Sequence, residues 1–208
     1  MKVAIFFIAA VCAYLLSGVN PAIVLSHLIY HQDIRTLGSK NPGFTNFKRV
    51  FGGRYAWFVF VLDILKSVLL CLVFGWAFSA VGNSYQLGVA FTGFCAMLGH
   101  AYPVWYGLKG GKGFLVAAAA IWFIDWRSAL IAMAIMMLLL FTVKYMSLSV
   151  MTAAVSCPLT LLLFGVETPW VLVCVTLSVL FLIYRHKENI RRLRAGTESK
   201  FSLKSKVE

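Results

Sequence analysis

Seven apolar runs divide this sequence, and the connections between them are too short to hold a separate soluble domain. The runs lie near 3–29, 55–81, 87–105, 113–124, 128–143, 148–165 and 169–184. A helix of about 20 apolar residues crosses a bilayer. The pattern therefore predicts an all-α, polytopic membrane protein with about seven transmembrane helices. Five or six spans remain the alternative, because the fourth and fifth runs are short.

Basic residues are distributed unevenly about these runs. With seven spans, sixteen of the nineteen Lys and Arg residues fall on one side of the membrane, in the segments 30–54, 106–112, 144–147 and 185–208. Cationic loops stay in the cytoplasm, so we expect the N-terminus outside and the C-terminus in the cytoplasm. The net charge of +12 then reflects topology and contact with the lipid bilayer rather than nucleic-acid binding, which needs cations on a folded polar surface.

The chain shows no internal repeat or low-complexity linker that would divide it. We expect a single transmembrane domain over residues 1–196. Residues 197–208 have little apolar surface to offset the entropy of ordering, so they are expected to form a loosely ordered basic cytoplasmic tail. Within the first run, Pro21 removes a helix hydrogen bond, which predicts a kink near residues 17–21.

The loop after the first run, residues 38–49, combines glycines, hydroxyls, amides and cations. Glycine allows backbone amides to approach an anion, and a guanidinium can hold a phosphate in a bidentate manner. The candidate residues here are Ser39, Asn41, Gly43, Thr45, Asn46 and Arg49. An ordinary basic loop is the alternative reading of the same composition.

A second segment, residues 99–113, ends in Lys-Gly-Gly-Lys-Gly. Two ammonium groups around a backbone with little steric bulk predict a phosphate nest. The candidate residues are His100, Lys109, Gly110, Gly111, Lys112 and Gly113. The segment is not a P-loop, because Gly113 follows the lysine where Ser or Thr is required.

The third polar segment directly follows the last apolar run. If that helix continues, His186, Asn189 and Arg192 share one of its faces. Histidine and asparagine do little to fix orientation in a membrane, so His186 and Asn189 are functional candidates.

Two further pairs lie at helical spacing. Asp63 and Lys66 are three residues apart within the second run and are expected to pair, because burial of either alone is costly. His27 and His31 have a spacing that could seat a metal, but the other two of the four histidines lie far along the chain. We therefore expect no metal and no cofactor.

Taken together, the three segments resemble the membrane-embedded bacterial glycerol-3-phosphate acyltransferases that use acyl phosphate. The resemblance rests on Gly-Ser-x-Asn-x-Gly-x-Thr-Asn-x-x-Arg at 38–49, on Gly-His-x-x-Pro with Lys-Gly-Gly-Lys-Gly at 99–113, and on His-x-x-Asn at 186–189. It implies a seven-span protein of the bacterial cytoplasmic (inner) membrane whose active site faces the cytoplasm. It also implies transfer of a fatty acyl group from acyl phosphate to the 1-hydroxyl of sn-glycerol 3-phosphate, giving lysophosphatidic acid.

Under this resemblance the catalytic residues are Ser39, Arg49, Lys112, His186 and Asn189, and the remaining candidates of the three segments bind substrate. We expect Lys112 and the backbone of Gly110–Gly113 to neutralise the donor, and Arg49, His186 and Asn189 to orient glycerol phosphate. The proton acceptor stays open among His186, His100 and a substrate phosphate oxygen. A small transporter of organic phosphates is the rival interpretation, although transporters commonly bind near the midplane and carry repeats.

Overall fold

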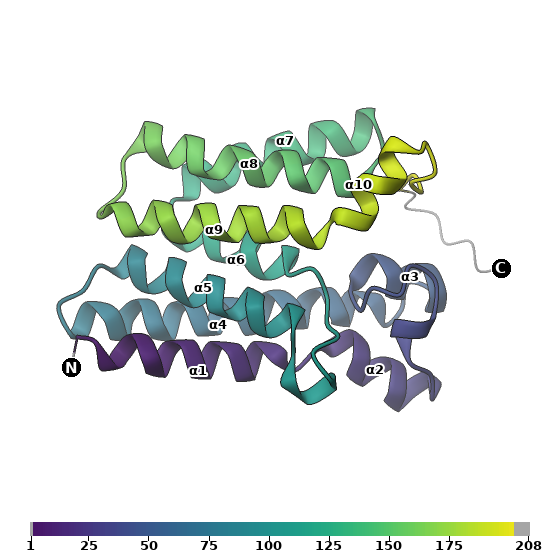
Figure 1. Ribbon diagram of the computed structural model, residues 1–208, viewed down its shortest axis with the longest axis horizontal. Helices are drawn as coiled ribbons and strands as arrows, with labels where there is room; N and C mark the ends of the chain where they lie inside the picture. The colour runs from purple at the N-terminus through teal and green to yellow at the C-terminus, as the bar shows by residue number, and fades with distance from the viewer. Residues whose placement is uncertain (1, 202–208) are drawn as a thin grey trace.

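Two groups of long helices, with a shorter helix between them, make up the molecule (Figure 1). The computed structural model describes residues 2–201, and these residues contain helices and turns but no strand. One group comprises α1 (Ala4–Gly18), α4 (Ala56–Ala80) and α5 (Tyr85–Ala101). The other comprises α7 (Trp126–Thr142), α8 (Met146–Phe164) and α9 (Pro169–Arg185). The short helix α6 (Phe114–Ile124) packs against members of both groups.

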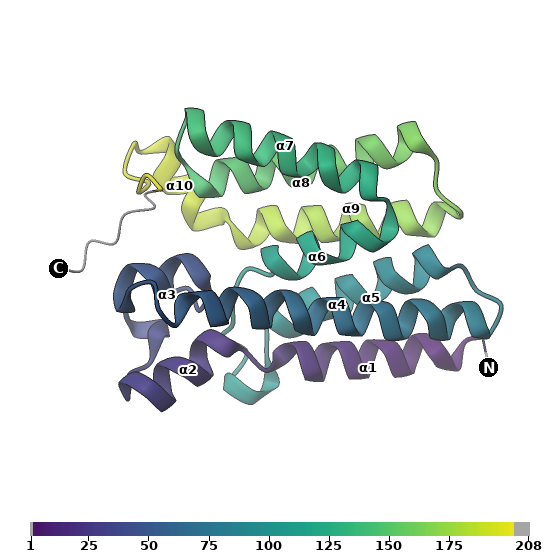
Figure 2. The same ribbon diagram turned by 180° about the vertical axis from the view of Figure 1, so that it is seen from behind.

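Two polar helices and one short apolar helix gather at one end of this bundle. They are α2 (Pro21–Tyr30), α3 (Phe44–Phe51) and α10 (Lys187–Arg194), with the 3₁₀ turns η1 (Ile34–Thr36) and η2 (Val104–Tyr106). Both views place α2, α3 and α10 at the end opposite to the start of α1 (Figure 2). The three polar segments singled out in the sequence therefore share one end of the molecule.

Within residues 2–201, four segments are long and apolar enough to cross a membrane: Ala4–Tyr30, Ala56–Ala80, Tyr85–Tyr106 and Met146–Phe164. A fifth is added if α9 and α10, which meet at a bend of 55°, count as one span. Helix α6 has only 11 residues and is therefore about 16 Å long, roughly half of a 30 Å hydrocarbon core. The all-α membrane architecture is confirmed in this form, and the count of seven spans stays a prediction.

The predicted interruption of the first run is confirmed. Helix α1 ends at Gly18 and α2 begins at Pro21, with Asn20 between them as the N-cap. The Asn20 side chain accepts a hydrogen bond of 3.1 Å from the Ile23 amide and donates one of 3.2 Å to the Pro42 carbonyl. One buried side-chain amide thus caps the start of α2 and ties it to the loop at residues 38–43.

Close packing of α1 against α5 depends on one glycine. A Cβ atom added at Gly99 would lie 2.1 Å from the carbonyl oxygen of Tyr14. Only a residue without a side chain permits such an approach of two backbones. This contact brings the end of α5, which carries His100, next to the break between α1 and α2.

The last apolar helix does not continue as the sequence analysis assumed. His186 ends α9 and also precedes α10, and the chain bends there. The condition for a face continuous with α9 is therefore not met: Asn189 and Arg192 lie in α10, and His186 is its N-cap residue. The bend nevertheless brings all three side chains to one cavity.

Candidate active site

A cavity of about 490 Å³ opens where the polar helices gather, and we call it the polar cavity. Segments far apart in the sequence meet there, including α3, the end of α5, the start of α8 and the junction of α9 with α10. Eleven of the residues selected from the sequence line it: Ser39, Asn41, Gly43, Thr45, Asn46, Arg49, His100, Lys112, Gly113, His186 and Asn189. The three motifs therefore form one site, and the individual roles of these residues stay predictions.

Three of the selected residues, Lys109, Gly110 and Gly111, are not among the described residues that line the polar cavity. The Gly110 amide donates to the Ala101 carbonyl and the Gly111 amide to the His100 carbonyl, both over 3.1 Å. These two amides are used within the chain, so they cannot form the nest that the sequence suggested. Lys112 and Gly113 remain as the cavity-lining residues of the glycine loop, defined here as residues 109–113.

Asn46 shapes the loop that precedes α3. Its side-chain oxygen accepts from the Ser39 amide over 2.8 Å, and its side-chain nitrogen donates to the Leu37 carbonyl over 3.0 Å. Because Asn46 is buried, its full set of hydrogen bonds is needed to offset the loss of water. This residue holds Ser39 at the cavity and is well placed as a support of the loop.

A continuous set of hydrogen bonds runs from the glycine loop to the C-terminal segment. Lys112 donates to the Asn189 side-chain oxygen, and the Asn189 nitrogen donates to Glu198 over 2.6 Å. Glu198 also accepts from Ser147 over 2.7 Å and from Arg192 over 2.7 Å. The carboxylate thus orients Asn189, which in turn fixes the position of the Lys112 ammonium.

Burial and neighbouring groups shift the pKa values of Lys112 and Glu198, the charged residues in this set of hydrogen bonds. Burial lowers the pKa of Lys112 to about 8; Glu198 opposes that shift, and Arg192, Arg185 and Arg49 add to it. Burial raises the pKa of Glu198, but hydrogen bonds from Asn189, Ser147 and Arg192 outweigh it and leave that pKa below its usual value. Glu198 is therefore a carboxylate at neutral pH, and most Lys112 side chains carry a charge.

Sequence reasoning missed Glu198, Ser147 and Ser199 as lining residues of the polar cavity, and it named Arg192 only as a neighbour of His186 and Asn189. Glu198 and Ser199 lie in the segment expected to begin the loose tail, and Ser147 lies in the connection before an apolar run. Arg49 Nη2 donates to Ser199 Oγ over 3.0 Å, so residues 198 and 199 pack at the site. Residues 202–208 lie outside the described part of the chain, and the expectation for the tail as a whole stays a prediction.

His186 lines the polar cavity, and the contact of its ring with the backbone indicates which nitrogen is an acceptor. Its Nδ1 lies 2.8 Å from the Leu182 carbonyl oxygen, and a carbonyl can only accept. Nδ1 therefore carries the proton in the neutral ring, which leaves a lone pair on Nε2. This is the arrangement that a general base requires.

The carboxylates and the cations that line the polar cavity differ in the kind of partner they have. Both carboxylates that line it bind cations, Asp63 through Lys66 at 2.9 Å and Glu198 through Arg192 at 2.7 Å. The pairing predicted for Asp63 and Lys66 is thereby confirmed. Arg49 and Lys112 instead bond to the neutral side chains of Ser199 and Asn189. These two cations can neutralise a bound dianion.

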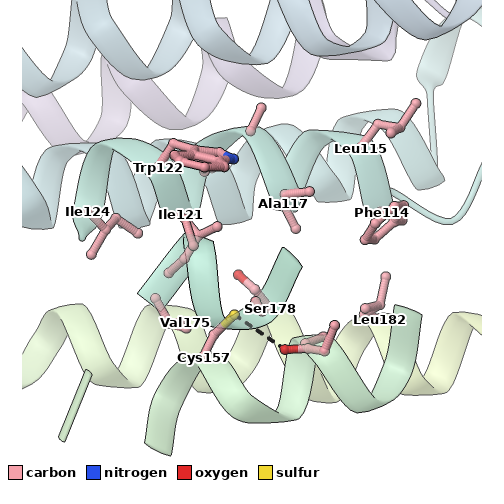
Figure 3. A pocket seen from close by; sticks show the side chains of 18 of the residues that line it. Phe114, Leu115, Ala117, Ile121, Trp122, Ile124, Cys157, Val175, Ser178 and Leu182 are labelled. Carbon is pink, nitrogen blue, oxygen red and sulfur yellow. Dashed lines mark hydrogen bonds between the residues drawn. The ribbon is translucent and has the colours of Figure 1, made fainter. Parts of the chain in front are cut away.

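A second cavity, of about 370 Å³, lies deeper in the bundle and is called the apolar cavity. Side chains of α6, among them Ile121, face Cys157 of α8 and Val175 of α9 across it (Figure 3). The two cavities share four lining residues: Phe60, Phe114, Leu115 and Met136. The polar cavity at the end of the bundle thus adjoins the apolar cavity between its helices.

This fold and site define a membrane-embedded protein in which a cation-lined cavity adjoins an apolar cavity. The family described as glycerol-3-phosphate acyltransferase matches residues 7–196, and the chain belongs to that family. The resemblance found in the sequence is confirmed.

Curated relatives carry the same description. The glycerol-3-phosphate acyltransferase of Lactiplantibacillus plantarum is 37% identical over 96% of this chain and 92% of its own. That of Aquifex aeolicus is 35% identical over 91% of this chain and 95% of its own.

Solved structures agree in fold. PlsY, an integral membrane glycerol 3-phosphate acyltransferase solved in its glycerol 3-phosphate form, matches with a TM-score of 0.86 and 34% identity, over 95% of this chain and 96% of its own. Its lysophosphatidic acid form matches with a TM-score of 0.81 and 32% identity. With its apolar helices, the chain is accordingly a multi-pass membrane protein.

Proposed function

We propose that this protein transfers a fatty acyl group from acyl phosphate to the 1-hydroxyl of sn-glycerol 3-phosphate. The hydroxyl oxygen attacks the acyl carbonyl carbon and forms the ester bond. The bond between that carbon and the phosphate oxygen breaks, and inorganic phosphate leaves with the electron pair. The hydroxyl proton passes to an acceptor, and lysophosphatidic acid is the lipid product.

The observation that carries this proposal is the pairing of the charges in the polar cavity. Arg49 and Lys112 bond to neutral partners, whereas each lining carboxylate already has a cation. Two phosphate-bearing substrates need such cations, and a site that is organised before binding stabilises the charge that develops on the leaving phosphate. Acyl phosphate is a mixed anhydride with a good leaving group, so alignment and charge suffice without a covalent intermediate or a metal.

The apolar cavity suits the fatty chain of the donor. It adjoins the polar cavity at Phe60, Phe114, Leu115 and Met136. A phosphate at Lys112 would therefore leave the acyl chain free to enter between α6, α8 and α9. The relatives solved with glycerol 3-phosphate and with lysophosphatidic acid support the same pair of acceptor and product here.

Of the two histidines, we propose His186 as the acceptor of the hydroxyl proton through Nε2, because its Nδ1 is engaged by the Leu182 carbonyl. A phosphate oxygen of the substrate is the alternative acceptor. The His186→Gln variant distinguishes the two acceptors. If a substrate phosphate oxygen is the base, the rate depends on pH in the same way in the variant as in the wild type.

The proposed location is the cytoplasmic membrane of a bacterium, as a single domain over residues 1–196 with the polar cavity open to the cytoplasm. The uneven distribution of basic residues supports this orientation. Glycerol 3-phosphate then enters from the cytosol, and the lipid product remains in the bilayer.

The decisive experiment uses purified protein with glycerol 3-phosphate and one of three donors: acyl phosphate, acyl-CoA or acyl carrier protein. We expect lysophosphatidic acid from acyl phosphate alone. Product from the other donors alone would reject the assigned donor. A transporter of organic phosphates would give no product with any donor and would move labelled glycerol phosphate into proteoliposomes.

A further inference from the structure

Lys66, within α4, satisfies two carbonyl groups that the break between α1 and α2 leaves without their helical partners. Its ammonium donates to the Ser17 carbonyl over 2.9 Å and to the Val19 carbonyl over 3.0 Å. In a continuous helix the Ser17 carbonyl would accept from residue 21, but Pro21 has no amide hydrogen. The Val19 carbonyl would accept from Ile23, whose amide donates to Asn20 instead.

The same ammonium determines which nitrogen of His100 carries a proton. Lys66 Nζ lies 3.1 Å from His100 Nδ1, so its three hydrogens point to Ser17, Val19 and His100, while Asp63 Oδ1 at 2.9 Å is an ion-pair contact. An ammonium can only donate, so Nδ1 accepts, and the neutral His100 ring carries its hydrogen on Nε2. Asp63 lies 3.5 Å from Nδ1, beyond good hydrogen-bond distance. His100 and His186 are therefore held in opposite tautomers.

The His100 ring packs directly against the glycine loop. A Cβ atom added at Gly111 would lie 2.2 Å from His100 Nε2. The Gly111 amide also donates to the His100 carbonyl over 3.1 Å. The next residue along the loop is Lys112, so a shift of the His100 ring changes the position of that ammonium.

We propose that Lys66 is a positioning residue for acyl transfer, which fixes His100 as the Nε2–H tautomer and thereby sets the glycine loop that carries Lys112. The ring, which lines the polar cavity, then presents a hydrogen-bond donor on its Nε2 side. This inference rests on the proposed function for its kinetic consequence, whereas its structural consequence can be measured without any turnover.

The test is ¹⁵N NMR of histidine-labelled protein in nanodiscs, with the His100 signals assigned by their loss in His100→Gln. In the wild type we expect a bare Nδ1 and a protonated Nε2. In Lys66→Met the remaining polar partner of Nδ1 is Asp63, so the proton should move to Nδ1. Lys66→Arg still donates and should keep the wild-type tautomer.

Kinetics give the second readout. Lys66→Met should lower kcat about tenfold, the effect of one charged hydrogen bond, and change the KM for glycerol 3-phosphate less than about twofold. Lys2→Met, at an exposed residue of the opposite end of the bundle, is the matched control and should behave as wild type. Lys66→Arg should recover part of the lost kcat.

A second variant covers the case in which Lys66→Met does not accumulate because Asp63 is left buried without its cation. Asp63→Asn combined with Lys66→Met removes both charges, a change that membrane and soluble proteins tolerate better than loss of one partner. An unchanged His100 tautomer and wild-type kcat in whichever variant folds would overturn the proposal. A changed tautomer in Lys66→Met, together with a wild-type protein that acylates nothing, would uphold the positioning of His100 and reject the acyltransferase function instead.

Discussion

Arg185 Nη2 donates to the Gly111 carbonyl oxygen over 2.9 Å, although 74 residues separate them in the sequence. The same guanidinium nitrogen lies 3.2 Å from the Gly110 carbonyl, and the group stacks over the Tyr102 ring. From the sequence alone, Arg185 belongs to a basic segment that fixes membrane topology. In the structure it also holds the glycine loop against the end of α5.

Replacing Arg185 should impair acyl transfer through that loop. Arg185→Met removes both donated hydrogen bonds and should lower kcat about tenfold, while Arg185→Lys should recover part of it because an ammonium cannot reproduce the planar fork. The measurement is lysophosphatidic acid formation at matched membrane abundance. Lys187→Met, an exposed neighbour, serves as the control, and equal rates in Arg185→Met and the control would contradict this role.

Gly111→Val should abolish acyl transfer while leaving membrane abundance nearly unchanged, because no charge is altered. The reason is steric: the new Cβ would lie 2.2 Å from His100 Nε2 and 3.1 Å from the Pro42 carbonyl oxygen. Gly53→Ala is the control, since a Cβ there meets nothing within 4 Å. A Gly111→Val protein that inserts normally and turns over at the wild-type rate would show that the loop tolerates this displacement.

Arg49→Ala should mainly raise the KM for glycerol 3-phosphate, by roughly ten- to a hundredfold, because a charged donor to the substrate phosphate is lost. Arg49→Lys should restore only part of the affinity. Steady-state kinetics with either substrate varied distinguish this from damage to donor binding. Arg54→Ala removes an exposed cation near the same end of the bundle and should leave both KM values unchanged.

The rate should fall on the alkaline side of neutrality if the Lys112 ammonium stabilises the leaving phosphate. Its pKa is lowered to about 8, so the charged form dominates below that pH and is lost as the pH rises through it. Lys112→Arg keeps its charge over this range, and its alkaline decline should disappear even if its rate is lower. An identical decline in both proteins would assign the titration to another group.

Reporters fused after Val143 and at the C-terminus should read cytoplasmic, and one fused at Asp125 should read external. The expectation follows from the position of the basic residues. The structure agrees with the part of this expectation that puts Val143 and the C-terminus on one side, because the junction of α7 with α8 lies at the same end as α10. An external C-terminus with a cytoplasmic reading at Asp125 would place the site on the wrong side for cytosolic substrate.

The sequence sufficed to predict an all-α membrane protein, and eleven of the fourteen site residues selected from it line the polar cavity. Local patterns reveal apolar runs and unusual polar clusters, but they do not show where a carbonyl or an amide finds its partner. The amide of Gly111 was expected to face an anion and instead donates to His100. Glu198 escaped notice because it follows the last helix in a polar segment, where neither periodicity nor a motif marks its packing on Asn189.

The apparent affinity of this protein for its donor is expected to depend on how much lipid is present. Phe60, Phe114, Leu115 and Met136 line both cavities, so one substrate would arrive by diffusion in the plane of the bilayer and the other by diffusion in water. The effective concentration of the acyl donor is its mole fraction in the bilayer, and that of glycerol phosphate is its molarity in water. Added inert lipid should therefore slow the reaction by surface dilution of the donor, without altering the dependence on glycerol phosphate.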